Sequence, residues 1–370
     1  MPGFAGKLLW ASIRLSLRFA RSSRCRTALM KATAHPFVKW AGGKAQLLTA
    51  LSEILPQKIG TYYEPFVGGG AVFFALAVQG RFGAAVLNDT NQELMDAFKV
   101  IRDFPDELIA NLKDRNDAYK ASPDSAYYNW RHTDPKTLDP VARAARFIAL
   151  NKTGFNGLYR VNKKGEFNVP IGKYENPRIC DETNLRACSE LLNRVPNTLH
   201  TSDFVNAVEG AEPGDVVYFD PPYLPLSATA NFTTYTPDGF GLDDHHRLAA
   251  LFKLLVEKGV SVILSNSDTE ITRALYAGFE IHPVQAKRNI NSKGDKRGAI
   301  TELIIVGREV GPASVALELP PIPVPAVAQC LECGATFPAE QKACMECGSV
   351  NMTIVEDPED ADDETLVPAP

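Results

Sequence analysis

Apolar and polar residues alternate in blocks along residues 36–110, and the blocks follow a strand–helix order. The runs at 62–66 and 84–87 are short, apolar and bounded by turn residues, which is typical of buried strands. The runs at 72–77 and 93–103 have the composition of helices. Strands that alternate with helices in this way predict a parallel sheet.

The same pattern returns after residue 200, whereas the stretch 106–200 is helical, polar and aromatic. Further strands are predicted at 216–219, 260–264, 279–284 and 303–306. Further helices are predicted at 142–150, 181–192 and 243–256. Within 151–174, two short extended runs flank a turn at Lys163-Lys164-Gly165, which indicates a β-hairpin.

The two ends of the chain differ from its middle. Residues 1–29 carry six basic side chains and no acid; we interpret them as an over-extended start or a disordered leader, with an organellar targeting peptide as the alternative. Residues 311–328 are rich in Pro, Ala and Val, as in a linker, and 356–364 contain seven acids and cannot form a core. The net charge of −5 therefore says little about partners. No run of 18 apolar residues predicts a membrane span.

The most informative segment is Asp220-Pro221-Pro222-Tyr223, directly after the apolar run 216–219. The prolines make the turn stiff, and the carboxyl end of a parallel strand is where open α/β sheets bind ligands. Hydrogen bonds from a planar amine to the Asp220 carboxylate and the Pro221 carbonyl would stabilise the positive charge that grows as the amine attacks a sulfonium methyl group. Tyr223 would stack on the base, which must rotate out of its duplex. A plain strand-terminating turn is the alternative.

A glycine triplet, Gly68-Gly69-Gly70, lies where a predicted strand meets a helix. Asp89 follows Gly68 by 21 residues, at the end of the next strand. An acid about 20 residues beyond such a turn is the usual partner of ribose hydroxyls in nucleotide sites, so we expect a cofactor here. The alternative is a tight packing turn. The preceding segment 37–44 has two lysines, an aromatic residue and two glycines, and suits contact with an anion or a purine.

The predicted hairpin and a second stretch, 287–297, are basic. Arg can pair with guanine, Asn with adenine, and an aromatic ring can wedge into a base stack. Basic loops are usually solvated surface. Two of them, together with the Asp220–Tyr223 turn that suits a planar amine, favour nucleic acid as partner. The cations of the hairpin, against the single acid Glu166, are Lys152, Arg160, Lys163, Lys164 and Lys173.

Four of the seven cysteines form two pairs near the C-terminus, Cys330 with Cys333 and Cys344 with Cys347, each followed by glycine. Four thiolates at this spacing suit a closed tetrahedral zinc site that can supply folding energy to a small module. A redox pair or disulfides are the alternative. His245 and His246, at the start of a predicted helix, are interpreted as surface or capping residues.

Together these motifs resemble the Dam-type DNA adenine N6-methyltransferases, the D12 class. The resemblance spans about 36–306 and rests on segments Phe37–Lys44, Glu64–Gly70, Asn151–Pro170, Asp220–Tyr223 and Leu226–Phe232. It implies S-adenosylmethionine as methyl donor, a flipped adenine as acceptor and double-stranded DNA, preferably GATC, as substrate. Phe155 stands where Tyr is common and Gly69-Gly70 where Ala-Gly is usual. The zinc ribbon lies outside the family pattern.

The resemblance also implies roles for individual residues. The catalytic segment is Asp220, Pro221, Pro222 and Tyr223. The donor pocket is expected to contain Trp40, Lys44, Phe66, Gly68, Asp89 and Asp220. DNA contacts are expected from Lys39, Phe155, Asn156, Leu158, Arg160 and Pro170, with Arg288 in the second basic stretch.

The sequence therefore predicts an α/β fold: a Rossmann-like methyltransferase sheet, an inserted helical and hairpin target-recognition domain, and a small C-terminal zinc ribbon. The expected organisation is a leader at 1–33, a catalytic domain at 34–105 and 201–308, the insertion at 106–200, a linker at 309–328, the ribbon at 329–350 and an acidic tail at 351–370. We expect a cytoplasmic monomer, bacterial or phage-encoded, whose ribbon binds DNA or a partner protein. A cytosine N4-methyltransferase and a non-catalytic DNA-binding protein are the alternatives.

Overall fold

The computed structural model describes most of the chain, in two compact units, Met1–Val310 and Gly311–Pro370. The described residues are 34–40, 47–225, 240–287 and 299–308 in the first unit and the strands 327–330, 336–338 and 352–355 in the second. Lys44, Arg288 and the segment Leu226–Phe232 therefore lie outside the described residues.

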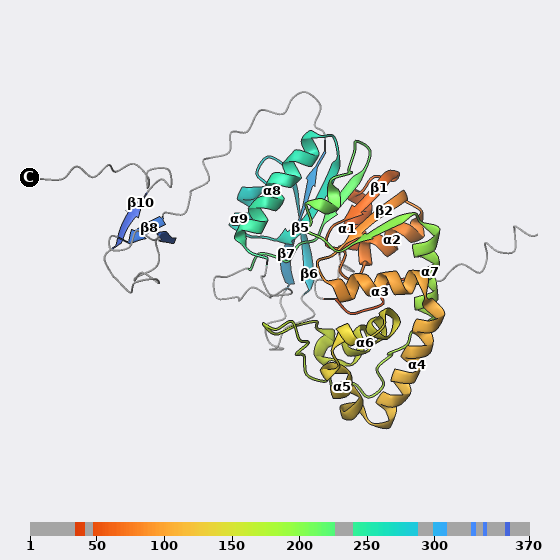
Figure 1. Cartoon of the computed structure of the whole chain (residues 1–370). Helices are drawn as coiled ribbons and strands as arrows, with labels where there is room; N and C mark the ends of the chain where they lie inside the picture. The colour runs from red at the N-terminus through yellow and green to blue at the C-terminus, as the bar shows by residue number, and fades with distance from the viewer. Residues whose placement is uncertain are drawn as a thin grey trace, which may run out of the picture. The chain divides into compact units, whose positions relative to one another are not determined.

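The first unit is built on a seven-stranded sheet with the order β3-β2-β1-β4-β5-β7-β6 (Figure 1). The strands from β3 to β5 are parallel, and β7 runs antiparallel to both β5 and β6. The bounds are β1 Ile59–Glu64, β2 Phe82–Asn88, β3 Asn197–His200, β4 Val216–Phe219, β5 Ser261–Ser267, β6 Glu280–Lys287 and β7 Ala299–Gly307. This mixed α/β sheet confirms the predicted fold class at the level of its mainly parallel sheet.

Every strand predicted outside the hairpin segment 151–174 is present, within a few residues of its expected bounds. The short edge strand β3 was not predicted. Its four residues, Asn197–His200, alternate between half-buried and exposed and carry little apolar signal. Because β3 pairs with β2, the sheet extends into the end of the range 106–200 that was assigned to the insertion.

Helices cover the sheet. Their bounds are α1 Leu48–Ile54, α2 Ala71–Gln79, α3 Gln92–Asp103, α4 Pro105–Ala121, α5 Pro123–His132, α6 Pro140–Thr153, α7 Glu182–Arg194, α8 Leu242–Glu257 and α9 Glu270–Leu275, with short 3-10 turns at η1 Pro135–Thr137, η2 Phe155–Gly157 and η3 Asn206–Val208. Figure 1 shows α4, α5 and α6 grouped below α3, away from the strands. The described helices include none long and apolar enough to span a bilayer.

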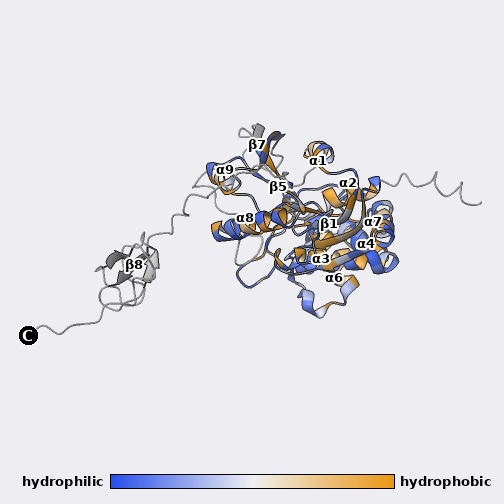
Figure 2. Ribbon diagram, turned by 90° about the horizontal axis from the view of Figure 1, so that it is seen from above, coloured by the Kyte–Doolittle hydropathy of each residue, from blue (hydrophilic) through white to orange (hydrophobic). Residues whose placement is uncertain are grey.

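Successive side chains of β4 point to opposite faces of the sheet, so this one strand contributes to two hydrophobic cores. Val216 and Tyr218 pack into the hydrophobic cluster on one side of the sheet, and Val217 and Phe219 into the cluster on the other. All four side chains are buried, as expected for a central parallel strand covered on both faces. In Figure 2 the hydrophobic colour likewise follows the central strands and the inner faces of helices.

A buried ion pair joins α6 to α3. Arg146 of α6, whose side chain is 3% exposed, bonds Glu93 of α3 at 3.0 Å and donates to the carbonyl of Trp130 on α5. Glu93 also accepts a hydrogen bond from the hydroxyl of Tyr159, which follows α6. The helices after α3 are thus held to the sheet layer by polar contacts as well as apolar ones.

The predicted hairpin is only partly present as regular structure. Its two arms run antiparallel but meet at two isolated bridges, Gly154 with Ile171 and Val161 with Phe167. A tight turn joins the arms, where the Gly165 N–H donates to the Asn162 carbonyl. Continuous strands do not form among these residues because η2 interrupts the first arm and few backbone groups are paired across the arms.

The second unit contains a three-stranded antiparallel sheet in the order β10-β8-β9. Its bounds are β8 Val327–Cys330, β9 Thr336–Pro338 and β10 Met352–Val355. Of the four paired cysteines, Cys330 is the last residue of β8, and the other three lie outside the described residues.

Candidate active site

The parallel strands bring four polar positions to one edge of the sheet. Glu64 ends β1, Asp89 follows β2, Asp220 follows β4, and Ser265 lies near the end of β5. Since β1, β2, β4 and β5 are parallel neighbours, their carboxyl ends form a single rim. This rim is the usual place for a ligand in an open α/β sheet.

The Asp220 segment is tied to neighbouring strands by side-chain hydrogen bonds. The hydroxyl of Ser265 donates to Oδ1 of Asp220 at 2.8 Å. The hydroxyl of Tyr223 donates to Glu302 of β7 at 3.1 Å, and the backbone N–H of Leu224 donates to the Asn266 side-chain oxygen at 3.1 Å. The turn is therefore held at its beginning, middle and end, in addition to the stiffness that its prolines give it.

A second carboxyl group, that of Glu64, is buried close to Asp220. Burial raises the pKa of Glu64 well above its usual range, and the nearby negative charge of Asp220 raises it further. The hydroxyl of Tyr62 donates to Glu64 at 3.0 Å. Burial also raises the pKa of Tyr218 and of Tyr223 well above the ordinary value. Their hydroxyls therefore keep their protons at neutral pH and can donate hydrogen bonds.

The glycine turn after β1 lies against Asp89, a contact that was not predicted from the sequence. The N–H of Gly68 donates to one Asp89 oxygen at 3.1 Å, and the N–H of Asn91 donates to the other at 2.9 Å. Burial nevertheless raises the pKa of Asp89 to about 6, because two backbone donors only partly replace water. The carboxyl group therefore titrates close to neutral pH.

Trp40 lies directly against Gly68. The backbone of Gly68 has φ +48°, and a Cβ placed there would be 2.6 Å from Cδ1 of Trp40. Trp40 also stacks on Tyr159, with 5.9 Å between the ring centroids. The structure thus brings together Trp40, Gly68 and Asp89, three residues that were predicted to share one pocket.

Phe66, another predicted pocket residue, belongs to an aromatic group near the glycine turn. It stacks on Phe204 at 5.5 Å and meets the edge of Phe240 at 5.6 Å. Neither Phe204 nor Phe240 was predicted from the sequence, because single aromatic residues in connecting segments carry no periodic signal. Ser265, Asn266 and Glu302 were missed for a related reason, since their roles depend on strand register.

Lys39 lies at the base of the segment after α6. The side-chain amide of Asn151 holds the Lys39 backbone by two hydrogen bonds of 2.8 and 2.7 Å. The Lys39 ammonium is 3.3 Å from the hydroxyl of Tyr174 and 4.3 Å from its ring centroid. Lys39 is therefore exposed but anchored, next to both arms of this segment.

The predicted DNA-contacting residues of this segment are grouped, and most are exposed. Phe155 is 47% exposed, which is unusual for an aromatic side chain, and Asn156 has φ +54°. The N–H of Phe155 donates to the carbonyl of Pro170 at 2.9 Å, so the two arms meet there. Arg160 donates to Asn168 at 2.6 Å and is exposed. Leu158 is different, because it is half-buried against the hydrophobic core.

Comparison with known proteins identifies the family. The family model for D12 class N6 adenine-specific DNA methyltransferases matches residues 40–290. The Type II methyltransferase M1.LlaDCHI of Lactococcus lactis subsp. cremoris is 43% identical over 279 residues, 74% of this chain and 96% of its own. M.MjaIII of Methanocaldococcus jannaschii is 45% identical over 285 residues, 73% of this chain and 98% of its own. The DNA adenine methylase of Escherichia coli K12 is 36% identical over 268 residues, 72% of this chain and 93% of its own.

The chain belongs to the D12 class N6 adenine-specific DNA methyltransferases. It is an adenine-specific DNA methyltransferase, as predicted. This membership decides against the two alternatives, a cytosine N4-methyltransferase and a non-catalytic DNA-binding protein. The family match includes both the glycine turn and the Asp220 segment, so the rim described above is the methyltransferase's candidate active site.

One interpretation of the methyltransferase sequence was wrong. His245 was taken as a surface or capping residue, but it is fully buried in the first turn of α8. Its ring meets the edge of Phe240 at 4.8 Å. Burial lowers the pKa of His245 to about 4, so the imidazole is neutral at physiological pH. The adjacent His246 is half-buried, because consecutive helical residues point in different directions.

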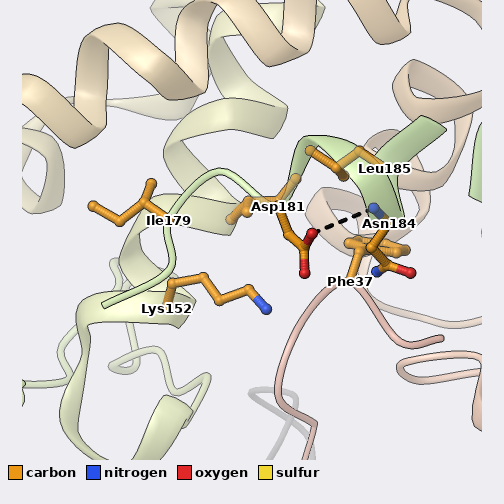
Figure 3. A pocket seen from close by; sticks show the side chains of 7 residues that line it. Phe37, Lys152, Ile179, Asp181, Asn184 and Leu185 are labelled. Carbon is orange, nitrogen blue, oxygen red and sulfur yellow. Dashed lines mark hydrogen bonds between the residues drawn. The ribbon is translucent and has the colours of Figure 1, made fainter. Parts of the chain in front are cut away.

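A shallow hollow with almost no enclosed space is shown in Figure 3. It is lined by Phe37, Ile148, Lys152, Ile179, Asp181, Asn184 and Leu185. Asp181 caps α7 by accepting the Asn184 N–H at 3.3 Å, and it also pairs with Arg178. Burial lowers the pKa of Lys152. These contacts explain the hollow as a packing feature of α6 and α7 beneath the 34–40 segment.

We predict that Gly68→Ala and Gly69→Ala will behave differently. Alanine at 68 must adopt a positive φ and clash with Trp40, so we expect a loss of about 1–2 kcal/mol in unfolding free energy and of most DNA methylation activity. Alanine at 69 needs no positive φ and would place its Cβ 3.3 Å from Cβ of Pro36, which a small shift relieves. Thermal unfolding and a methylation assay on both variants test this. Equal effects at the two positions would contradict it.

Proposed function

We propose that this methyltransferase uses S-adenosylmethionine, bound along the Trp40–Gly68–Asp89 side of the rim, to methylate a flipped-out adenine held by the Asp220 segment. The observation that carries the proposal is the shared rim. Asp89 and Asp220 follow β2 and β4, the two strands that flank β1, and the Gly68 turn follows β1 itself. A donor and an acceptor bound at these positions would be neighbours.

The residues present fit the donor. Asp89 is an anionic acceptor above its pKa, suited to ribose hydroxyls, and the missing side chain of Gly68 lets a ligand approach the backbone beside Trp40. Phe66 offers an apolar surface for a purine ring. When bound, the donor supplies a methyl group on a sulfonium: the amine nitrogen bonds to that carbon, the carbon–sulfur electron pair stays on sulfur, and one amine proton is released.

Asp220 and its turn supply what the amine needs. The exocyclic amine of adenine is a weak nucleophile, because its lone pair is delocalised into the ring. Acceptance of its N–H bonds by the Asp220 carboxylate and the Pro221 carbonyl would localise that lone pair and stabilise the positive charge that develops on nitrogen. Tyr223 would cover the face of the base. Glu64, with its raised pKa, would not add a second full negative charge beside Asp220.

The segment after α6 is our candidate for DNA reading. Exposed Phe155 is suited to fill the gap that a flipped base leaves, and the exposed Arg160 guanidinium is suited to a base edge. Lys39 lies against Gly157, which follows Asn156 in the chain, and Lys39 and Asn156 would add contacts to phosphate or bases. The likeness of these residues, including Leu158 and Pro170, to those of GATC-specific members supports GATC as the target. Arg288, from the other basic stretch, would add a further contact.

Zinc binding by the second unit is proposed from the spacing of its four cysteines. Cys330 of β8 pairs with Met352, the first residue of β10, so the end of β8 and the start of β10 are adjacent. Cys333 follows Cys330 by three residues, and Cys347 precedes Met352 by five. Cys333, Cys344 and Cys347 lie outside the described residues, so the proposal rests on the spacing of the two cysteine pairs, which suits a four-thiolate zinc ribbon.

We predict that expression in cells without adenine methylation will protect their DNA from a GATC endonuclease that N6-methyladenine blocks. Asp220→Ala removes the acceptor of the amine protons, so methyl transfer should fall more than roughly a hundredfold. Duplex affinity should remain, because phosphate and base contacts come from other residues. Digestion, nucleoside analysis and a binding titration measure the three effects.

The exposed Asp243 on α8 offers the matched control, and Asp243→Ala should protect DNA like the wild-type chain. Full protection by Asp220→Ala would refute the assigned role of Asp220. Methyladenine found without protection of GATC sites would refute the target but not the reaction.

We predict that donor affinity will fall about tenfold per pH unit below pH 6, because protonated Asp89 loses its charge as a hydroxyl acceptor. The contribution of Asp89 to folding stability changes with pH in the opposite direction from its contribution to donor binding. The pKa is raised on folding, so Asp89 favours the folded state most below about pH 4 and loses that advantage as the pH rises through 6. Calorimetric titration with S-adenosylmethionine at pH 5 to 8 tests the binding effect. Asp89→Asn should bind more weakly and without this pH dependence; an unchanged dependence would contradict the assignment.

We predict one zinc ion per chain in the purified full-length protein. Cys330→Ser should lower the zinc content and affinity, because the remaining three thiolates leave the tetrahedral site incomplete. Metal analysis and competition with a chelating dye measure this. The control is Cys180→Ser in the first unit, which should retain its zinc. A wild-type protein that binds no zinc at neutral pH under reducing conditions would contradict the assignment.

A further inference from the structure

A chain of two buried hydroxyl groups ends on the Asp220 carboxylate. The parallel register pairs Phe219 with Leu264, so the next residues along the strands, Asp220 and Ser265, are side by side. Ser265 Oγ lies 2.8 Å from Oδ1 of Asp220 and 2.9 Å from the hydroxyl oxygen of Tyr218. Ser265 and Tyr218 are both 0% exposed.

The direction of these hydrogen bonds follows from the donor inventory. A serine hydroxyl has one proton, and an ionised carboxylate has none to give. Ser265 must therefore donate to Asp220, which leaves its lone pairs to accept the proton of Tyr218. Because the pKa of Tyr218 is far above the ordinary value, its hydroxyl stays protonated and the order Tyr218 to Ser265 to Asp220 persists.

This chain restricts the terminal side-chain torsion of Asp220. Rotation of a carboxylate about the bond from Cβ to Cγ is broad and only weakly restrained by sterics. A short hydrogen bond from a neutral hydroxyl to an anionic oxygen fixes that rotation and strengthens the charge-bearing state. It also occupies only one of the several lone-pair directions of the carboxylate, so the group can still accept from an amine.

The surroundings explain why such support matters here. The carboxyl group of Glu64, the other acid close to Asp220, is 2% exposed and accepts a hydrogen bond from the hydroxyl of Tyr62. The neighbouring strands offer hydroxyl groups to this carboxylate, from Ser265 directly and from Tyr218 through Ser265. A carboxylate in such a site is stabilised by the hydrogen bonds it accepts.

We propose that Ser265 is a positioning residue for methyl transfer, supported by Tyr218, and that it holds the Asp220 carboxylate in the orientation that receives the amine. The inference rests on the proposed role of Asp220 and extends it to the neighbouring strand. Ser265 acts through Asp220, and its hydroxyl also lies within hydrogen-bonding reach of Tyr223 in the same turn.

Single-turnover kinetics with saturating S-adenosylmethionine and a GATC duplex test the proposal. For Ser265→Ala we expect the transfer rate to fall about 10- to 100-fold, the range found when an outer hydrogen bond to a metal-binding side chain is lost. The dissociation constants for duplex and donor should stay within about twofold. For Tyr218→Phe we expect a smaller fall, because Ser265 can still donate to Asp220.

The matched control is Ser189→Ala on α7. Ser189 is also a buried serine, but its hydroxyl bonds the carbonyl of Arg102, remote in sequence from the Asp220 turn. This variant measures the effect of deleting a buried serine hydroxyl and should transfer methyl groups at the wild-type rate. Thermal unfolding of all three variants shows whether their stabilities are comparable.

Two outcomes would overturn the proposal. One is a Ser265→Ala rate within twofold of wild type. The other is a rate loss that is matched by an equal loss of duplex or donor affinity. Asp220→Ala, assayed in parallel, distinguishes a failure of the role proposed for Ser265 from a failure of the role proposed for Asp220. If Asp220→Ala is inactive and Ser265→Ala is fully active, the role of Asp220 stands and that of Ser265 does not; if Asp220→Ala is active, the role of Asp220 fails as well.

Discussion

The parallel pairing of β4 with β1 on one side and β5 on the other is the constraint on which the active-site rim depends. It sets Asp220 beside Ser265 and Tyr218 beside the end of β1 that carries Glu64. Side chains alternate along a strand, so a slip of one residue would move Tyr218 and Phe219 to the wrong cores and separate Asp220 from Ser265. The apolar burial of β4 on both faces makes such a slip costly. Packing of two hydrophobic cores thus determines the position of one polar group.

Burial raises the pKa of Glu64 and of Asp89 on this rim by different amounts. The difference suits their proposed roles, because Asp89 is to accept hydrogen bonds from the donor and Glu64 is to stay uncharged beside Asp220. Asp89 receives two backbone N–H donors and titrates near neutrality, whereas Glu64 has its pKa raised well above the usual range. Asp220 accepts from Ser265, which favours its anionic form. A rim in which all three were fully charged would be unstable, because like charges in a poorly solvated place repel strongly. Each of the three accepts hydrogen bonds, and the deeper burial of Glu64 accounts for its higher pKa relative to Asp89.

The sequence predicted the sheet, most helices and the central motifs because each depends on local patterns. The run Val216–Phe219 is apolar throughout, and Gly68 and Asp89 stand at a recognisable spacing. Ser265, Glu302 and Phe240 could not be found in this way, since they reach the site only through strand register and helix packing. His245 was misinterpreted because one polar residue at a helix start gives no sign of which face it occupies. Edge strand β3 lacked the hydrophobic alternation that identifies a strand.

The contacts of the segment after α6 also connect the proposed DNA-recognition residues to the proposed donor site. Asn151 holds the backbone of Lys39, and Tyr159 bonds Glu93 while it stacks on Trp40, which in turn lies against Gly68. A displacement of this segment must therefore disturb Trp40 or α3, both of which adjoin the glycine turn. If the segment reads DNA, the same contacts connect a correctly bound sequence to the geometry of the donor side. A rigid connection of this kind makes specificity depend on packing between α6 and α3 as well as on the side chains that meet the bases.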